Sequence, residues 1–103
     1  MRGIRTSRTF DDQLVDLLAF GEQAFGRRVA DEKRLRVYRT IRQFLAVHPA
    51  TKQPDPVHGL CVYPIARTPF VVLYDFDDNE IRLHFVFHRS ADLSGLEPNS
   101  AVF

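Results

Sequence analysis

The sequence changes from a helical to a strand periodicity near residue 60, and this change constrains the fold more than any other feature. In the first part, Leu14, Leu17 and Leu18 recur at three- and four-residue steps, which is the spacing of an amphipathic helix. After residue 60, apolar and polar residues alternate in runs rich in β-branched and aromatic side chains. Residues 49–59 lie between the two parts and are rich in proline, which fits neither a helix interior nor a central strand. Helices followed by strands predict an α+β fold.

Two antiparallel helices are expected before the proline-rich loop. Thr9 and Asp12 have the spacing of a capping box, which predicts that the first helix starts there and runs to about Phe25. The second helix is predicted from about Asp31 to just before Pro49. The segment between them has the length of a helix-hairpin loop.

Three strand-like runs follow the loop, and turn-forming residues separate them. They are expected to form a three-stranded antiparallel meander over residues 60–65, 70–76 and 81–88. Residues 4–9 are predicted to form a short edge strand at the amino-terminal side. The remainder, from residue 89 onward, shows little periodicity and is predicted to be a short tail.

The last strand-like run carries most of the residues that could perform chemistry. Strict alternation predicts that its apolar residues share the face that packs on the helices, namely Ile81, Leu83, Phe85 and Phe87. The opposite face would then present Arg82, His84 and His88. Histidine can transfer protons near neutral pH and arginine can bind phosphate, so this face is a candidate site for a ligand.

Length and composition limit the classes of protein to be considered. A chain of 103 residues that is 45% hydrophobic can bury one core, so residues 1–103 are expected to form a single domain. The net charge of +1 does not indicate direct, sequence-specific DNA binding. Cys61 cannot form an internal disulfide, and no apolar run reaches the ~20 residues of a membrane helix, so the cytoplasm is the expected compartment.

Neither a metal nor a cofactor is predicted. The four histidines lack metal-ligand spacing, and His84 and His88 would lie ~13 Å apart along one strand, which is too far to share an ion. The sequence has no glycine-rich phosphate loop. Cys61 lies in an apolar run and is expected to be a core residue, not a nucleophile.

Local sequence motifs add a family resemblance to this order of elements. The motifs are the segment 63–65 (Tyr-Pro-Ile), the segment 68–74 (Thr-Pro-Phe-Val-Val-Leu-Tyr), an acidic turn, and a strand ending at His88 with Asp92 close behind. Together they resemble the RelE/ParE superfamily of toxins over nearly the whole chain. The resemblance implies the toxin of a type II toxin–antitoxin module, which inhibits bacterial growth and is neutralised by a cognate antitoxin.

Departures from the family pattern bear on the target. RelE-like ribonucleases usually place an arginine where this chain has Val71, and many supply a tyrosine near the carboxyl end, where this chain has none after Tyr74. The arginine often found in ParE-like members just before the acidic residue is Ala91 here. The match to the ParE-like pattern is therefore imperfect at Ala91. The missing arginine at Val71, the missing terminal tyrosine and the few basic residues of the strand-rich half nevertheless favour a ParE-like protein that binds DNA gyrase. The alternatives are a RelE-like ribosome-dependent mRNA endonuclease and a non-toxic member that only binds a partner.

Candidate functional residues follow from these hypotheses. If the protein is a ribonuclease, Arg82 and His88 are the candidate catalytic residues. Candidate residues for binding the target, whether gyrase or the ribosome, are Arg67, His84 and Arg89. The resemblance implies that the antitoxin lies across the helix hairpin and the sheet edge, where the candidate contacts are Phe20, Leu35, Arg39 and Arg42.

Overall fold

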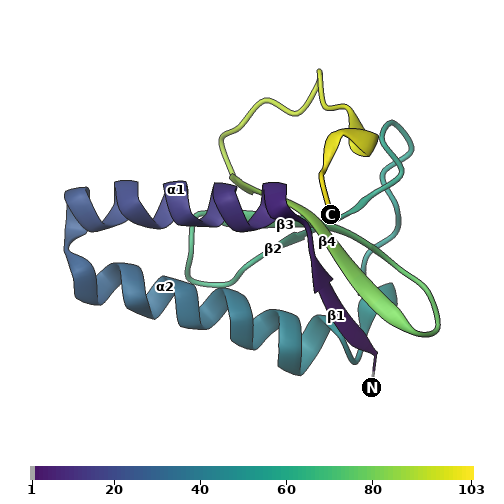
Figure 1. Cartoon of the computed structure of the whole chain (residues 1–103), viewed down its shortest axis with the longest axis horizontal. Coiled ribbons are helices and arrows are strands. Elements are labelled where there is room, and N and C mark those ends of the chain that lie inside the picture. The colour runs from purple at the N-terminus through teal and green to yellow at the C-terminus, as the bar shows by residue number, and fades with distance from the viewer. Residues whose placement is uncertain (1) are drawn as a thin grey trace.

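The computed structural model describes residues 2–103 as a helix hairpin packed on a mixed sheet (Figure 1). The helices α1 (Arg8–Phe25) and α2 (Arg27–Thr40) run antiparallel. The strands are β1 (Gly3–Thr6), β2 (Cys61–Pro64), β3 (Phe70–Phe76) and β4 (Glu80–His88). No helix within residues 2–103 has the length and apolar character needed to cross a membrane.

Helix α1 begins earlier than the capping-box spacing predicted. The N-cap is Ser7, whose Oγ accepts a hydrogen bond from the backbone N–H of Phe10 at 2.8 Å. Thr9 instead lies within the helix, and its Oγ1 accepts a hydrogen bond from the Val102 N–H at 3.0 Å. The prediction of a helix start at Thr9 and Asp12 was therefore wrong, because the serine two residues earlier satisfies the free N–H groups of the first turn.

The turn between the helices is also tighter than expected. Gly26 alone separates α1 from α2, so the second helix begins at Arg27 and not near Asp31. Gly26 has φ +92°, a conformation that residues with a Cβ rarely adopt, and this explains how a single residue reverses the chain. Beyond α2, the helical path continues as one π-helical turn, Ile41–Leu45, whose Ile41 and Leu45 are buried.

The sheet confirms the predicted meander and adds the amino-terminal strand to it. Its order is β1-β4-β3-β2, in which β2, β3 and β4 pair antiparallel and β1 pairs parallel with β4. Because β1 covers only Glu80 to Leu83, the edge of β4 beyond that point lacks a strand partner there. The N-cap residue of α1 and a side chain within the helix pair with this edge: Ser7 Oγ donates to the His84 carbonyl at 2.7 Å, and the Val86 N–H donates to Gln13 Oε1 at 2.9 Å.

A β-bulge at His84 divides β4 into two halves. Odd-numbered side chains face the helices before the bulge, and even-numbered side chains face them after it. Tyr74 lies opposite Leu83 and Leu73 lies opposite Phe85, so His84 is an extra residue without a partner on β3. Before the bulge, Ile81 and Leu83 point into the core between the sheet and the helices, and after it Val86 does so. Phe85 and Phe87 point to the other face, so the prediction that all four apolar residues of the strand share one face was wrong.

The carboxyl-terminal tail covers the second face of the sheet. Leu60, Leu73 and Phe85 form a second buried cluster there, and partly buried residues of the tail pack against it, namely Leu93, Leu96 and Ala101. The Arg8 N–H donates to the Val102 carbonyl, which fastens the end of the chain to the start of α1. The segment from residue 89 onward is therefore a packed layer of the fold, although it has no regular element longer than one 3₁₀ turn, Pro98–Ser100.

Candidate functional site

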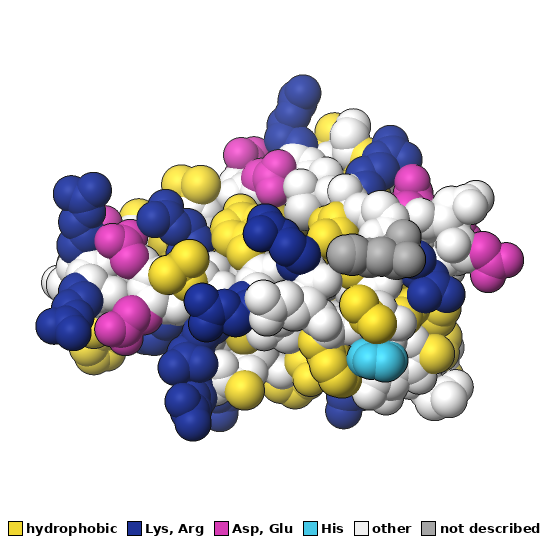
Figure 2. Space-filling view, turned by 90° about the horizontal axis from the view of Figure 1, so that it is seen from below, with side chains coloured by type: hydrophobic (Ala, Val, Ile, Leu, Met, Phe, Trp, Pro, Cys, Tyr) yellow, Lys and Arg dark blue, Asp and Glu magenta, His cyan; other side chains and the backbone are white. Residues whose placement is uncertain are grey.

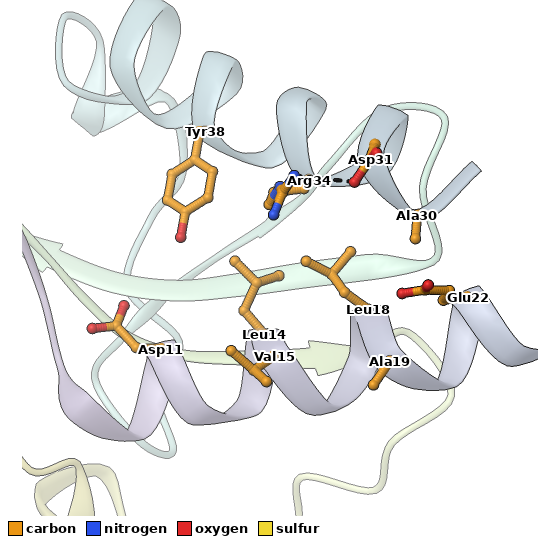
Figure 3. A pocket seen from close by; sticks show the side chains of 10 residues that line it. All are labelled: Asp11, Leu14, Val15, Leu18, Ala19, Glu22, Ala30, Asp31, Arg34 and Tyr38. Carbon is orange, nitrogen blue, oxygen red and sulfur yellow. Dashed lines mark hydrogen bonds and ion pairs between the residues drawn. The ribbon is translucent and has the colours of Figure 1, made fainter. Parts of the chain in front are cut away.

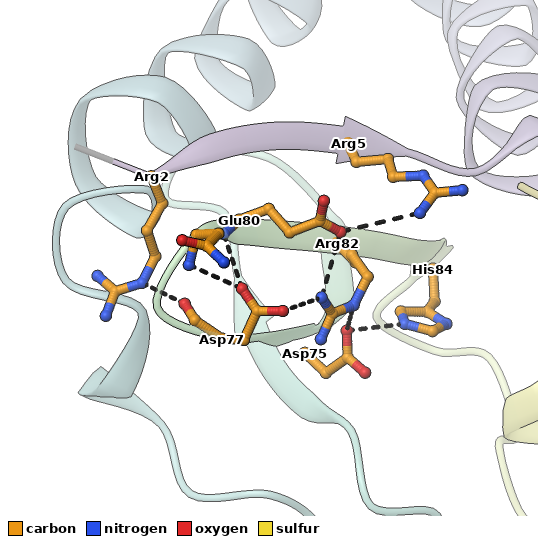
Figure 4. A network of polar contacts seen from close by, with 8 residues as sticks. Arg2, Arg5, Asp75, Asp77, Glu80, Arg82 and His84 are labelled. Carbon is orange, nitrogen blue, oxygen red and sulfur yellow. Dashed lines mark hydrogen bonds and ion pairs between the residues drawn. The ribbon is translucent and has the colours of Figure 1, made fainter.

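Arg82 stands at the centre of an acidic network near the β3–β4 turn (Figure 4). Its Nε donates to Asp75 Oδ1 at 2.7 Å, and its Nη1 donates to Asp77 Oδ2 at 2.8 Å and to Glu80 Oε2 at 3.2 Å. The hydrogen bond from Arg82, together with those from the backbone N–H groups of Asn79 and Glu80, lowers the pKa of Asp77 to about 2. The same carboxylates raise the pKa of Arg82 above its usual range.

The network leaves Arg82 poorly placed to bind a phosphate. Three carboxylates already engage its Nε and Nη1, and a phosphate group would meet their negative charge as it approached. Arg5 extends the network, since its Nη1 lies 3.9 Å from Glu80 Oε2. The arrangement therefore serves to hold the turn together more readily than to stabilise a transition state.

His84 belongs to this network and is covered by the tail. Its Nε2 lies 3.0 Å from Asp75 Oδ1, and the ring of Phe103 meets its ring edge-on with centroids 4.9 Å apart. The side chain is only 14% exposed. Its Nδ1 is buried and has no hydrogen-bond partner among residues 2–103. His84 was predicted to contact the target, yet the structure places it beneath Phe103 and away from the predicted Arg67 and Arg89.

His88 lies at the far end of β4 and on the opposite face from Arg82. The bulge turns His88 toward the helix side, where it lines a cavity with residues of α1. Its Nδ1 lies 2.7 Å from Ser90 Oγ. Six residue steps along the strand separate it from Arg82, a distance of at most ~20 Å. The structure therefore does not bring the two candidate catalytic residues to one phosphate.

Arg67 and Arg89 do come together, at the end of the sheet formed by the β2–β3 turn. Arg67 is exposed in this turn with φ 62°, a left-handed conformation that is uncommon for a residue with a Cβ. Arg89 follows β4, and its Nη2 donates to the Thr68 carbonyl while its N–H donates to the Pro69 carbonyl, each at 2.7 Å. Within the described chain, no carboxylate oxygen lies within 4.0 Å of a side-chain nitrogen of either arginine.

The helix hairpin presents the residues predicted to contact an antitoxin. Leu35, Arg39 and Arg42 are exposed and follow one another at helical spacing along the outer side of α2 and its π-helical extension. Figure 2, which views the molecule from the side of α2, shows basic side chains interspersed with hydrophobic ones on this face. Phe20 is 72% exposed but lies on α1, apart from that row. The structure thus groups three of the four predicted residues.

The two helices enclose a groove that the sequence did not predict (Figure 3). Its volume is about 380 Å³, and its floor includes Leu14 and Leu18. Acidic side chains outnumber basic ones along its walls, where Asp31 accepts a hydrogen bond from Arg34 at 3.0 Å. Figure 3 shows Leu14 and Leu18 pointing from α1 toward α2 between these polar groups.

A smaller and more apolar cavity lies where the helix hairpin meets the end of the sheet. We call it the sheet-end cavity, and its volume is about 70 Å³. Its lining includes residues of α1, α2, β3 and β4, among them Leu17, Gly21, Phe25, Lys33, Phe70 and His88. Phe20, which was predicted from the sequence to contact an antitoxin, also borders this cavity.

Groups able to act as a nucleophile or a metal site are buried or scattered. Burial raises the pKa of the Cys61 thiol, and its Sγ donates to the Lys52 carbonyl at 3.4 Å, so this thiol is a core group. Tyr74 is fully buried, its Oη donates to the Pro49 carbonyl at 2.7 Å, and burial raises its pKa as well. Across residues 2–103, no group of three or more His, Cys, Asp or Glu side chains is close enough to hold a metal ion.

Comparisons with known proteins place the fold. No protein-family model matches the sequence, and no curated protein matches it either. A chain in a structure of the chromosomal ParDE TA system from P. aeruginosa is similar in structure, with a TM-score of 0.73 and 16% sequence identity. The likeness covers 85% of this chain and 96% of that one. The resemblance stated from the sequence is thereby confirmed at the level of architecture: this chain has the fold of a ParDE-system protein.

Proposed function

We propose that this protein is the toxin of a type II toxin–antitoxin pair, which arrests bacterial growth in the cytoplasm and is neutralised by a cognate antitoxin. The observation that carries the proposal is the fold likeness to a ParDE-system chain, which extends over nearly the full length of both. The exposed row of Leu35, Arg39 and Arg42 gives a further reason, because a hydrophobic and basic helix face suits a partner protein.

We propose further that it acts by binding DNA gyrase, as expected for a ParE-like protein, and not by cleaving RNA. Three features favour binding over cleavage. Three carboxylates engage Arg82, the bulge turns His88 to the other face of the sheet, and Val71 stands where RelE-like ribonucleases carry an arginine. The ribosome-dependent endonuclease is the alternative, and it would need Arg82 to leave its acidic partners.

Growth of a bacterial host tests the toxin proposal directly. The chain is induced alone and together with the small open reading frame next to its gene. Growth arrest by the chain alone, relieved by co-expression, is the expected result. Unchanged growth at a verified level of folded protein would contradict the toxin proposal and would favour a non-toxic member of the fold that only binds its partner.

Purified components separate the two targets. Gyrase supercoiling and message cleavage on translating ribosomes are measured with the same protein sample. We expect inhibition of supercoiling and intact message. Message cleavage that is lost in both Arg82→Ala and His88→Ala would establish the ribonuclease instead, and cleavage that survives both changes would exclude these residues from its active site.

A further inference from the structure

The sheet-end cavity has the size and lining of a socket for one apolar side chain. Leu17, Phe25 and Phe70 supply apolar walls from α1 and β3. A cavity needs ~10–15 Å³ of comparable space to hold one water molecule, so a space of about 70 Å³ can accept a group of several carbon atoms. A leucine side chain is of this size, and its burial would tighten a complex about tenfold or more.

Among the residues that line this socket the charged one is basic, while the acidic Glu22 and Asp31 line the adjoining interhelical groove. Lys33 lines the cavity, and its Nζ lies 5.0 Å from the centre of the Phe25 ring, while His88 borders the cavity from β4. Arg89 lies just outside, since its N–H donates to the carbonyl of the lining residue Pro69, and Arg67 precedes Pro69 by two residues in the same turn. Among the described residues that line the cavity, none is acidic. The interhelical groove differs, because Asp11, Glu22 and Asp31 all line it.

Gly21 lines the cavity from α1. Glycine inside a helix is destabilising relative to alanine. A Cβ built at Gly21 would meet no atom within 4 Å, so packing within the chain does not require glycine at this position. Because Gly21 lines the cavity, a bulky side chain at this position is expected to hinder an incoming group.

We propose that the sheet-end cavity binds one leucine-sized apolar side chain of an acidic segment of the antitoxin. The apolar walls take the side chain, and Lys33, His88, Arg67 and Arg89 attract the acidic residues beside it. The identity of the partner rests on the proposed function, whereas the chemistry of the bound segment rests on the cavity itself.

Synthetic peptides test the chemistry without the antitoxin. The full-length protein is titrated by NMR with a short acidic peptide that has one central leucine, with the same peptide carrying serine in place of leucine, and with a lysine-rich version that keeps the leucine. Shift changes are expected at Gly21, Lys33 and Phe70. The serine peptide should bind about tenfold or more weakly, because it loses the burial energy of leucine. Equal binding of all three peptides, or shift changes confined to other surfaces, would overturn the proposal.

A blocking variant tests the partner. Gly21→Trp places a bulky side chain at the lining of the cavity, and Gln23→Trp adds the same side chain at an exposed position of α1 that does not line it. Binding to the purified product of the adjacent open reading frame is measured by calorimetry, after circular dichroism and thermal unfolding establish that both variants are folded. Gly21→Trp should weaken binding about tenfold or more, and Gln23→Trp should leave it unchanged.

Charge reversal supplies a second, independent variant. Lys33→Glu should weaken binding, and raising the salt concentration should weaken binding of the parent protein, because the attraction is between solvent-accessible charges. Lys52→Glu, in the exposed loop far along the chain from the cavity, is the matched control. Equal affinity of the parent, Gly21→Trp and Lys33→Glu would overturn the inference while leaving the toxin proposal intact.

The remaining outcomes are also decisive. If the adjacent gene product fails to bind the parent protein, the proposed function loses its partner, and the peptide titration alone decides the chemistry of the cavity. If the parent forms dimers that Gly21→Trp abolishes, as measured by sedimentation, the cavity binds a second copy of this chain and the proposal is wrong.

Discussion

The arginines at the two ends of β4 differ in whether they have acidic partners within the chain. At the first end, before the bulge, Arg82 is bound by Asp75, Asp77 and Glu80, so the charges of the network are met within the chain. At the last end, Arg67 and Arg89 have no carboxylate within 4.0 Å among residues 2–103, and an apolar cavity opens beside them. A charged side chain with an ionic partner inside the chain stabilises the fold, whereas one without such a partner is available to bind another protein. Substitutions at the two ends should therefore have separable effects.

The largest loss of stability is expected for a substitution at Ser7, which contacts β4 at the bulge. Ser7 is fully buried, and its Oγ both caps α1 and donates to the carbonyl of His84. Ser7→Ala removes the cap and leaves that carbonyl without its donor, so the free energy of unfolding should fall by about 2 kcal/mol. Urea unfolding followed by circular dichroism measures this. Thr9→Ala, at the position first expected to cap the helix, should cost clearly less, and the reverse order would contradict the capping role of Ser7.

The second largest loss of stability is expected at the first end of β4, where Arg82 is paired with three carboxylates. Arg82→Met keeps much of the side-chain volume but leaves three carboxylates facing one another, and the free energy of unfolding should fall by about 1–2 kcal/mol. That figure is modest because the carboxylates are partly exposed to solvent.

Arg89→Met is the matched change at the open end. It should lower the free energy of unfolding by about 0.5–1 kcal/mol, less than Arg82→Met, because Arg89 loses its Nη2 hydrogen bond to the Thr68 carbonyl but no ionic partner within the described chain. Equal losses of stability in the two variants, measured by urea unfolding, would remove the contrast between the ends of β4.

A smaller effect of opposite sign is expected at the cavity. Gly21→Ala should raise the free energy of unfolding by about 0.5–1 kcal/mol, since alanine favours the helix and its Cβ meets open space. Gly26→Ala should lower it, because Gly26 has φ +92° and alanine would be strained there. Thermal unfolding of the two variants side by side measures both signs. A destabilised Gly21→Ala would show that glycine serves the fold at this position.

The smallest effect is the pH dependence of the stability that Asp77 contributes at the first end of β4. The pKa of Asp77 is lowered to about 2 in the folded protein, compared with about 4 when unfolded. Its contribution to stability is therefore complete above about pH 4 and is lost as the pH falls toward 2. NMR titration of the Asp77 carboxyl gives its pKa directly. In Arg82→Met, that pKa should move back toward 4, and an unchanged value would exclude Arg82 as the main cause.

Periodicity predicted the order of elements because it reports which side chains are buried. The helix hairpin, the meander and the tail all follow from it. Helix ends were less predictable, since Ser7, Thr9 and Asp12 all offer capping side chains and only the position of β4 decides between them. The single-residue turn at Gly26 was missed because a longer loop is equally compatible with the sequence.

The candidate site was less predictable because the β-bulge leaves no mark in the alternation of the sequence. His84 as an extra residue reverses the facing of Phe85 and Phe87, and with them the surroundings of His88. The pairing of Arg82 with acidic side chains was more predictable from the sequence. Asp75 and Arg82 flank one acidic hairpin turn at positions that pair across the two strands, so the sequence held that signal. Residues of four separate elements line the sheet-end cavity, so no local sequence pattern could predict it.

The bulge at His84 also affects how this chain should be aligned with its structural relatives. A relative whose fourth strand lacks the extra residue would require a gap of one position inside β4. Without that gap, the residues after His84 would be matched against positions that face the opposite side of the sheet. Sequence identity summed across β4 would then understate kinship, and residues that perform the same task in two proteins would be scored as substitutions.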